Sequence, residues 1–354
     1  MKTVPNKHQI SKAEKVKEAK QRNRMVGSLD QFKKTFPTSD IVLDAIFRAR
    51  LQKTEGNCIC GRPLSLYRKI ANKSAYKCGC GKKIYPLKGT PLGGCKFNLA
   101  IMMQVFYHMF ISKNGMSTAE LVRLTNVKYD TLFNIRMSVS DLMGECVMNT
   151  PFMKDLPIEA DECYPYFETG YGPNFIYKRS IYSERCAAVL CLVQRNGICK
   201  AFVMPEKNIN SVKELFAKYA PKNVTYYTDS SNLYEFLRDK NNGYTTDFVN
   251  HRNGEFVKVG NPEVHTNGVE GFNSYMKTAL HRIHKGVSYE RMQSYLNNLS
   301  FNRSFLNATS FEAFDLILKS LPPLSINTQK NQVIRINENN TFNNSKTTYV
   351  WKAA

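Results

Sequence analysis

Three acidic residues occupy positions from which rigid elements could bring their carboxylates together. Asp161 ends the run Leu-Pro-Ile-Glu-Ala-Asp and Asp229 ends Asn-Val-Thr-Tyr-Tyr-Thr-Asp, and both runs favour β-strands. Glu270 lies in a third stretch, EVHTNGVEGFNSYMK, which spans residues 263–277. Carboxylate oxygens at two strand ends and on one helix are suitable ligands for a pair of Mg2+ or Mn2+ ions acting on a phosphodiester. We therefore expect Asp161, Asp229 and Glu270 to form a two-metal phosphoryl-transfer site.

The third stretch has the spacing of a helix with a polar face. Thr266 or Asn267 can cap its start, and Glu270, Ser274 and Lys277 then recur at intervals of three or four residues. An acid and a base on one helical face could reach the same phosphodiester.

Several nearby acids are rejected as metal ligands because they fall on other faces of the strand, in loop-like sequence or before the helix: Glu159, Glu162, Asp239, Asp247 and Glu263. The first two, which flank the candidate aspartate, are expected on other faces of its strand. Glu162 is the strongest alternative among the five.

Four of the ten cysteines form two close pairs, Cys58-Ile-Cys60 and Cys78-Gly-Cys80. Short extended runs and glycine turns surround both pairs. Four thiolates would hold Zn2+ tetrahedrally, and so small a module needs the metal as its core. The C-x-C spacing is tighter than the usual C-x2-C, so free structural thiols are the alternative to a structural zinc site.

Residues 96–150 have the pattern of helices joined by short turns, and a capping box at Ser117 opens one of them. Lys128 and Arg136 are expected to face outward from the helix that follows. This arrangement predicts a helix-turn-helix that contacts a DNA groove. A helical linker bundle is an equally good interpretation of the same pattern.

The composition favours a polyanionic partner. The 354 residues include 50 Lys and Arg against 29 Asp and Glu, a net charge of +21. DNA is the first candidate, because its phosphates attract such a surface. Neither an amphipathic basic helix nor a lipidation motif points to a membrane. No signal peptide is evident, so we expect a soluble protein in the nucleus of a eukaryotic host, or otherwise in the cytoplasm and nucleoid.

From residue 151 the pattern changes from helices to strands. Three antiparallel strands, with a hairpin turn at Arg195-Asn-Gly, precede a helix, a fourth strand and further helices. This order is typical of a ribonuclease H-like domain, a mixed α/β fold whose adjacent first and fourth strands would bring Asp161 to Asp229. The expected organisation is a basic disordered tail (1–28), a helical lead-in (29–56), a zinc-ribbon-like module (57–95), a helix-turn-helix (96–150), a ribonuclease H-like catalytic domain (151–310) and a partly disordered extension (311–354).

Together these pieces resemble the DDE transposases of the bacterial insertion-sequence group related to eukaryotic Merlin elements, the ISXO2-like transposases. The matching residues are Asp161-Glu-Cys-Tyr, Thr-Asp229-Ser, Val-Asn-His251, His265-Thr-Asn267-Gly-Val-Glu270-Gly-Phe and Lys277. The cysteine pairs and the helix-turn-helix precede them in the family's order. The sequence departs from the family at Asn273, where tryptophan is usual, and in its C-x-C pairs.

The resemblance implies a function and a role for each matching residue. Asp161, Asp229 and Glu270 would bind Mg2+ or Mn2+, and Lys277 would contact transposon-end DNA. Asn267 is the reserve candidate for the third ligand. His265, like His251, would orient a carboxylate or touch a phosphate, with a purely structural histidine as the alternative.

The same resemblance implies hydrolysis at the transposon ends and transfer of the 3′-hydroxyl into target DNA. The zinc module and helix-turn-helix would recognise the terminal inverted repeats, with a homodimer or higher oligomer on DNA. Two other functions stay open: a domesticated, catalytically silent DNA-binding protein, and a ribonuclease H-like nuclease without strand transfer.

Overall fold

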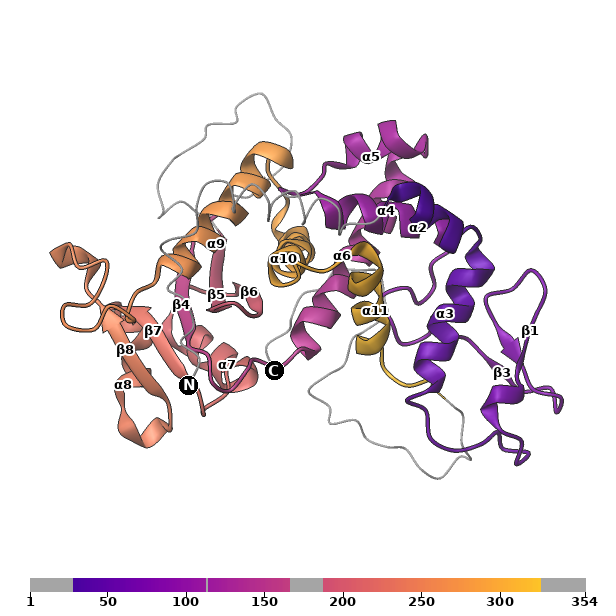
Figure 1. Ribbon diagram of the computed structural model, residues 1–354, viewed down its shortest axis with the longest axis horizontal. Helices are drawn as coiled ribbons and strands as arrows, with labels where there is room; N and C mark the ends of the chain where they lie inside the picture. Colours follow the sequence, from indigo (N-terminus) through magenta and orange to yellow (C-terminus); the bar gives the residue numbers. More distant parts are fainter. Residues whose placement is uncertain (1–27, 113, 166–186, 326–354) are drawn as a thin grey trace, which may run out of the picture.

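The computed structural model describes residues 28–112, 114–165 and 187–325 (Figure 1). The basic tail expected over 1–28, apart from its last residue, and most of the expected C-terminal extension lie outside these ranges. Within them, no helix is both long enough and apolar enough to cross a membrane.

The N-terminal half consists of helices and one small sheet. Helices α2 (Leu29–Thr35) and α3 (Ser39–Leu51) begin after Ser28 and Thr38, whose side chains accept hydrogen bonds from the first turn. A 3-10 turn and three short antiparallel strands follow: η2 (Leu64–Leu66), β1 (Arg68–Lys69), β2 (Tyr76–Lys77) and β3 (Lys83–Ile84). The next elements are α4 (Leu99–Ile111), α5 (Thr118–Thr125) and α6 (Tyr129–Asn149).

A five-stranded sheet organises the second half of the chain. Its strands are β4 (Ile158–Cys163), β5 (Ala188–Gln194), β6 (Cys199–Met204), β7 (Thr225–Asp229) and β8 (Thr245–Val249). Their order is β6-β5-β4-β7-β8, with β4 antiparallel to β5, β5 antiparallel to β6, and β7 and β8 parallel to β4. The expected hairpin turn joins β5 to β6, with Asn196 at φ 54°. The first and fourth strands are neighbours, as the sequence predicted.

Helices lie on both faces of this sheet. The helical elements in this half of the chain are α7 (Ile209–Tyr219), η3 (Asn232–Tyr234), α8 (Glu235–Arg238), η4 (Lys240–Asn242), η5 (His251–Asn253), α9 (Asn267–Thr278), the π-helix η6 (Ala279–Ile283), α10 (Tyr289–Ser304) and α11 (Ser310–Ser320). Helix α9 packs on β4 and β5 and buries Phe272 in the same apolar cluster as Cys191. Alternate strand residues such as Ala160 face the opposite layer, where Phe216 of α7 is buried.

Helix α6 connects the two halves of the molecule (Figure 1). It packs against α10 and β6 on one side and against α4, α5 and α11 on the other. Helix α11 thereby returns to the N-terminal helices. Arg50 of α3, which is buried, fixes this return by donating hydrogen bonds to the carbonyls of Pro322 (2.8 Å) and Pro323 (2.7 Å). Residues 310–325 thus contribute to the N-terminal core.

The pair α5 and α6 has the expected helix, turn, helix form. Asn126 adopts the left-handed conformation in the turn, and Lys128 is exposed just before α6. The outward orientation predicted for Arg136 was wrong, because its side chain is 1% exposed. Its guanidinium lies 4.2 Å from the ring centre of Tyr295 and its Nη2 lies 3.2 Å from His284 Nε2. Apart from Asn149, the exposed residues of α6 lie in its N-terminal turns, and a helix-turn-helix role stays a prediction.

Candidate active site

Two of the predicted acids are brought together by strand pairing. Strands β4 and β7 are parallel neighbours, with Glu159 opposite Tyr227. The same register carried two residues further brings Asp161 level with Asp229. Asp229 is the last residue of β7 and Asp161 lies two residues before the end of β4, so both aspartates lie toward the carboxyl ends of adjacent strands, where parallel sheets commonly place their sites.

Helix α9 supplies the third acid. Glu270 lies in its first turn, where the Thr266 hydroxyl donates a 2.9 Å hydrogen bond to Glu270 Oε1. His251 Nε2 lies 3.4 Å from the same oxygen. The Glu270 side chain keeps 42% of its surface exposed, so it faces an open side of the site.

Burial and neighbouring charges both act on Asp161. Burial, with the negative charges of Asp229 and Glu270, raises the pKa of Asp161 to about 7. The positive charge of Lys277 acts in the opposite direction. The structure thus places Asp229, Glu270 and this exposed lysine of α9 within electrostatic reach of Asp161, whereas the catalytic role of the three acids stays a prediction.

Each acid has a neighbour that fixes one of its oxygens. Asn273 Nδ2 donates to Asp161 Oδ2 over 2.8 Å, and the backbone N–H of Ser231 donates to Asp229 Oδ1 over 2.9 Å. Asn273 is buried, so the departure from tryptophan at this position places an amide against the first acid instead of an indole. Its role as a hydrogen-bond donor could not be recognised before the fold was known.

The two acids that flank Asp161 differ from each other. Glu162 is on the opposite face of β4, where burial, then the charges of Asp161 and Asp229, raise its pKa to about 8. The expectation that Glu159 lies on a different face of the strand from Asp161 was wrong, because residues two apart on a strand share a face. Its carboxylate points to the start of α9 and accepts a 2.9 Å hydrogen bond from the Val269 N–H.

The remaining predicted DNA contacts lie around α9. Lys277 and Asn267 are exposed, whereas His265 is partly buried. His265 Nδ1 lies 3.1 Å from Arg195 Nη2 and 3.5 Å from Glu159 Oε1, which favours the structural interpretation of this histidine. Contacts of Lys277, Asn267 and Lys128 with DNA stay predictions.

The donor set fits hard divalent cations. Carboxylate oxygens are the ligands that Mg2+ and Mn2+ prefer, and rigid strand ends and a helix start hold them here. The raised pKa of Asp161 is a further sign of fit, since it reflects burial and, after it, neighbouring negative charges that a divalent cation would neutralise.

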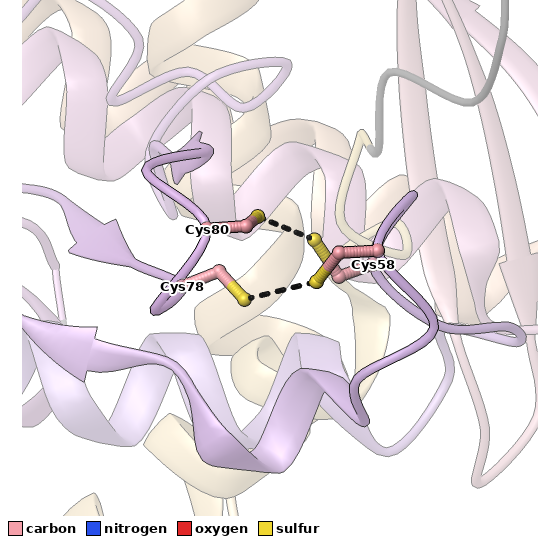
Figure 2. Close-up of side chains that lie close together, drawn as sticks. Cys58, Cys78 and Cys80 are labelled. Atoms are coloured by element: carbon pink, nitrogen blue, oxygen red, sulfur yellow. Dashed lines mark hydrogen bonds between the residues drawn. The ribbon is translucent and has the colours of Figure 1, made fainter.

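The four predicted zinc ligands also converge. Cys58 Sγ lies 3.5 Å from Cys80 Sγ, and Cys60 Sγ lies 3.6 Å from Cys78 Sγ (Figure 2). All four sulfurs lie within 4.8 Å of one another. Tetrahedral zinc with bonds of about 2.3 Å requires sulfur separations of about 3.8 Å, so the cluster has a suitable size.

The pKa of one of these thiols is lowered, which favours its thiolate form. A backbone hydrogen bond at Cys60 and a side-chain hydrogen bond from Tyr67 lower the pKa of Cys58 to about 6. A thiolate is the form that binds zinc. The cluster is therefore compatible with structural zinc despite its tight C-x-C spacing.

Known proteins are similar to parts of this chain. Residues 154–304 match the family described as ISXO2-like transposase domain. Over 144 residues the chain is 31% identical to an uncharacterized protein in transposable element ISH50 of Halobacterium salinarum. That alignment covers 40% of this chain and 47% of the relative, so the chain spans about half of the relative's length.

Two solved structures align more weakly. They are the crystal structures of the Mos1 strand transfer complex and of a pre-cleavage Mos1 transpososome, with TM-scores of 0.24 and 0.23 and identities of 10% and 9%. Each alignment covers 58% of this chain, and 74% and 75% of the respective Mos1 chains. TM-scores this low support no argument about this chain.

Proposed function

Because residues 154–304 match the ISXO2-like transposase domain family, we propose that this chain is a DNA transposase of the DDE type. The observation that carries the proposal is the convergence of Asp161, Asp229 and Glu270 at the carboxyl ends of β4 and β7 and the start of α9. The strand order β6-β5-β4-β7-β8 supports a ribonuclease H-like class for this domain.

The proposed chemistry is phosphodiester hydrolysis at the transposon ends, followed by attack of the freed 3′-hydroxyl on target DNA. Asp161, Asp229 and Glu270 would hold two Mg2+ or Mn2+ ions, which would supply electrophilic stabilisation of the phosphate and activation of the attacking hydroxyl. The chain itself holds the acids in place, through Asn273 at the first and Thr266 at the third. This fixed geometry is what phosphoryl transfer chiefly requires of a protein.

The other parts of the chain would recognise DNA. We assign the cysteine module (57–95) and the exposed start of α6 to the terminal inverted repeats, and Lys277 to a phosphate near the cleaved bond. A net charge of +21 supports binding of more than one duplex. Pairing of two ends would require a homodimer or higher oligomer.

The direct test is metal-dependent cleavage and strand transfer on DNA that carries the inverted repeats flanking the gene. The variants are Asp161→Asn, Asp229→Asn and Glu270→Gln, which keep side-chain shape while removing a charge. We expect each to bind the repeats like the wild type but to lose cleavage and joining by at least about a hundredfold. Glu162→Gln is the matched control and should retain activity.

Other outcomes would favour the alternative functions. A wild-type chain that binds the repeats but never cuts, with either ion, would indicate a silent DNA-binding protein. Cleavage without joining to a second DNA would indicate a nuclease. Loss of activity in Glu162→Gln equal to that of the three acid variants would contradict the choice of acids.

A further inference from the structure

A buried ion pair lies beneath the three acids. Glu159 of β4 has no exposed surface, and its Oε1 accepts a 2.7 Å hydrogen bond from Arg195 Nε in the β5–β6 turn. A carboxylate buried this deeply requires a partner, because an isolated charge would be costly away from water. Arg195 is that partner, and its own side chain is only 17% exposed.

The second oxygen of Glu159 holds the start of α9. Glu159 Oε2 accepts a 2.9 Å hydrogen bond from the N–H of Val269, the third residue of the helix. Helix N-terminal N–H groups have no partner within the helix, and negative charge is favourable there. The close approach depends on Gly268, since a Cβ at that position would lie 2.8 Å from Glu159 Oε2.

Arg195 extends the same connection to two further segments. Its Nη2 donates to the carbonyl of His265 over 3.2 Å, just before α9, and its Nη1 lies 3.3 Å from Glu263. Its guanidinium also lies 4.9 Å from the ring centre of Tyr227 on β7. One side chain therefore contacts β4, β7 and the segment that leads into α9.

Each of these contacts lies close in sequence to one of the acids. Glu159 precedes Asp161 by two residues on the same face of β4, and Val269 directly precedes Glu270. Strands β4 and β7 hold their aspartates through backbone pairing, but α9 has no such pairing with the sheet. The distance of Glu270 from the aspartates thus depends on side-chain packing of α9, to which the contacts at the helix start contribute.

We propose that Glu159 and Arg195 are positioning residues for the three acids. By holding the acids in place, this pair sets the affinity of the site for its divalent ions. Both oxygens of Glu159 are engaged, so it acts through α9 and is not itself a metal ligand. The inference rests on the proposed metal-binding role of Asp161, Asp229 and Glu270. It goes further by assigning control of that site to a buried ion pair outside it.

The test measures Mn2+ binding to the full chain by the loss of the electron paramagnetic resonance signal of free Mn2+. The variants are Glu159→Gln and Arg195→Lys, and Asp161→Asn identifies the signal of the site. Arg48→Lys is the matched control, because Arg48 pairs with Asp44 on the exposed surface of α3. Circular dichroism and thermal melting check that each variant is folded.

We expect Glu159→Gln and Arg195→Lys to need about tenfold more Mn2+ for half-saturation, the usual effect of removing a group that orients a metal ligand. Arg48→Lys should bind Mn2+ like the wild type. A single-turnover cleavage assay should show the same increase in the Mn2+ requirement, with most of the rate recovered at saturating Mn2+. A loss that arose only from a damaged fold would lower the plateau rate and the melting temperature instead.

Folded Glu159→Gln and Arg195→Lys proteins that bind Mn2+ as tightly as the wild type would overturn the inference. The inference would also be overturned if Asp161→Asn bound as much Mn2+ as the wild type, because the Mn2+ site would then not be at the three acids. A third outcome is that both variants bind Mn2+ more weakly than the wild type, while the wild type itself never cuts DNA. This result would support the inference and contradict the proposed transposase activity.

Discussion

Gly268→Ala should disturb the active site although the substitution adds a single methyl group. The ideal Cβ would lie 2.8 Å from Glu159 Oε2 and 3.2 Å from its Cδ, closer than side chains tolerate. The carboxylate has little room to yield, because Arg195 and the Val269 N–H hold its two oxygens. Either the helix start moves away from β4, or one of these hydrogen bonds breaks.

Gly271→Ala on the same helix is the matched control, since no atom lies within 4 Å of its ideal Cβ. Alanine favours a helix over glycine by about 1 kcal/mol, so Gly271→Ala should stabilise the protein by up to that amount. At Gly268 the same gain is offset by overpacking of about 1–3 kcal/mol. The two alanine variants should therefore differ by about 1–3 kcal/mol in the free energy of unfolding.

Amide hydrogen exchange gives a local measurement of the same effect. Val269 is at the start of α9, and its N–H is protected by Glu159. Its exchange should accelerate about tenfold or more in Gly268→Ala, because 1.4 kcal/mol corresponds to a factor of ten, and should be unchanged in Gly271→Ala. Cleavage by Gly268→Ala should fall about tenfold, since small misplacements of catalytic groups are costly.

Equal stability of the two variants, with Val269 still protected and cleavage unchanged in Gly268→Ala, would refute the reasoning. That result would mean that the start of α9 tolerates displacement from Glu159. The Arg195 and Glu159 contacts would then be incidental to the position of Glu270.

Three further predictions concern other parts of the molecule. Cys60→Ser should reduce bound zinc from about one ion per chain to well below half of that, measured by elemental analysis, whereas Cys146→Ser should keep it; equal zinc in both would exclude the cluster as the site. Burial raises the pKa of Glu145 to about 7 from 4.5, so its contribution to stability is lost as pH rises between these values. In urea unfolding, the free energy of unfolding of Glu145→Gln should therefore rise relative to that of the wild type by up to about 3 kcal/mol between pH 5 and pH 8. A difference between the two proteins that does not change with pH would contradict this. Lys277→Ala should weaken DNA binding and lower the salt dependence by about one ion, whereas Lys319→Ala, on α11 among the N-terminal helices, should not.

Local sequence patterns were sufficient to predict the candidate acids. Asp161 and Asp229 follow runs of strand-forming residues, and Glu270 occupies the first turn of α9, although β4 continues to Cys163 and Thr266 makes no side-chain capping hydrogen bond. These features depend on neighbours within a few residues, so strand and helix periodicity reveals them. The cysteine pairs were identified in the same way, because their residue types and spacing are local.

Only the tertiary structure decided what surrounds those residues. Arg136 was expected outside because one helix gives no sign of being covered on two sides, whereas α6 packs against α10 and α4 at once. Arg195 reaches Glu159 and His265 across 36 and 70 residues of sequence, and no local pattern encodes a contact of that range. The sequence determined which residues could bind a metal, because that depends on side-chain chemistry and local periodicity. The tertiary structure decided what holds them in position, because buried charges find their partners only when distant segments pack together.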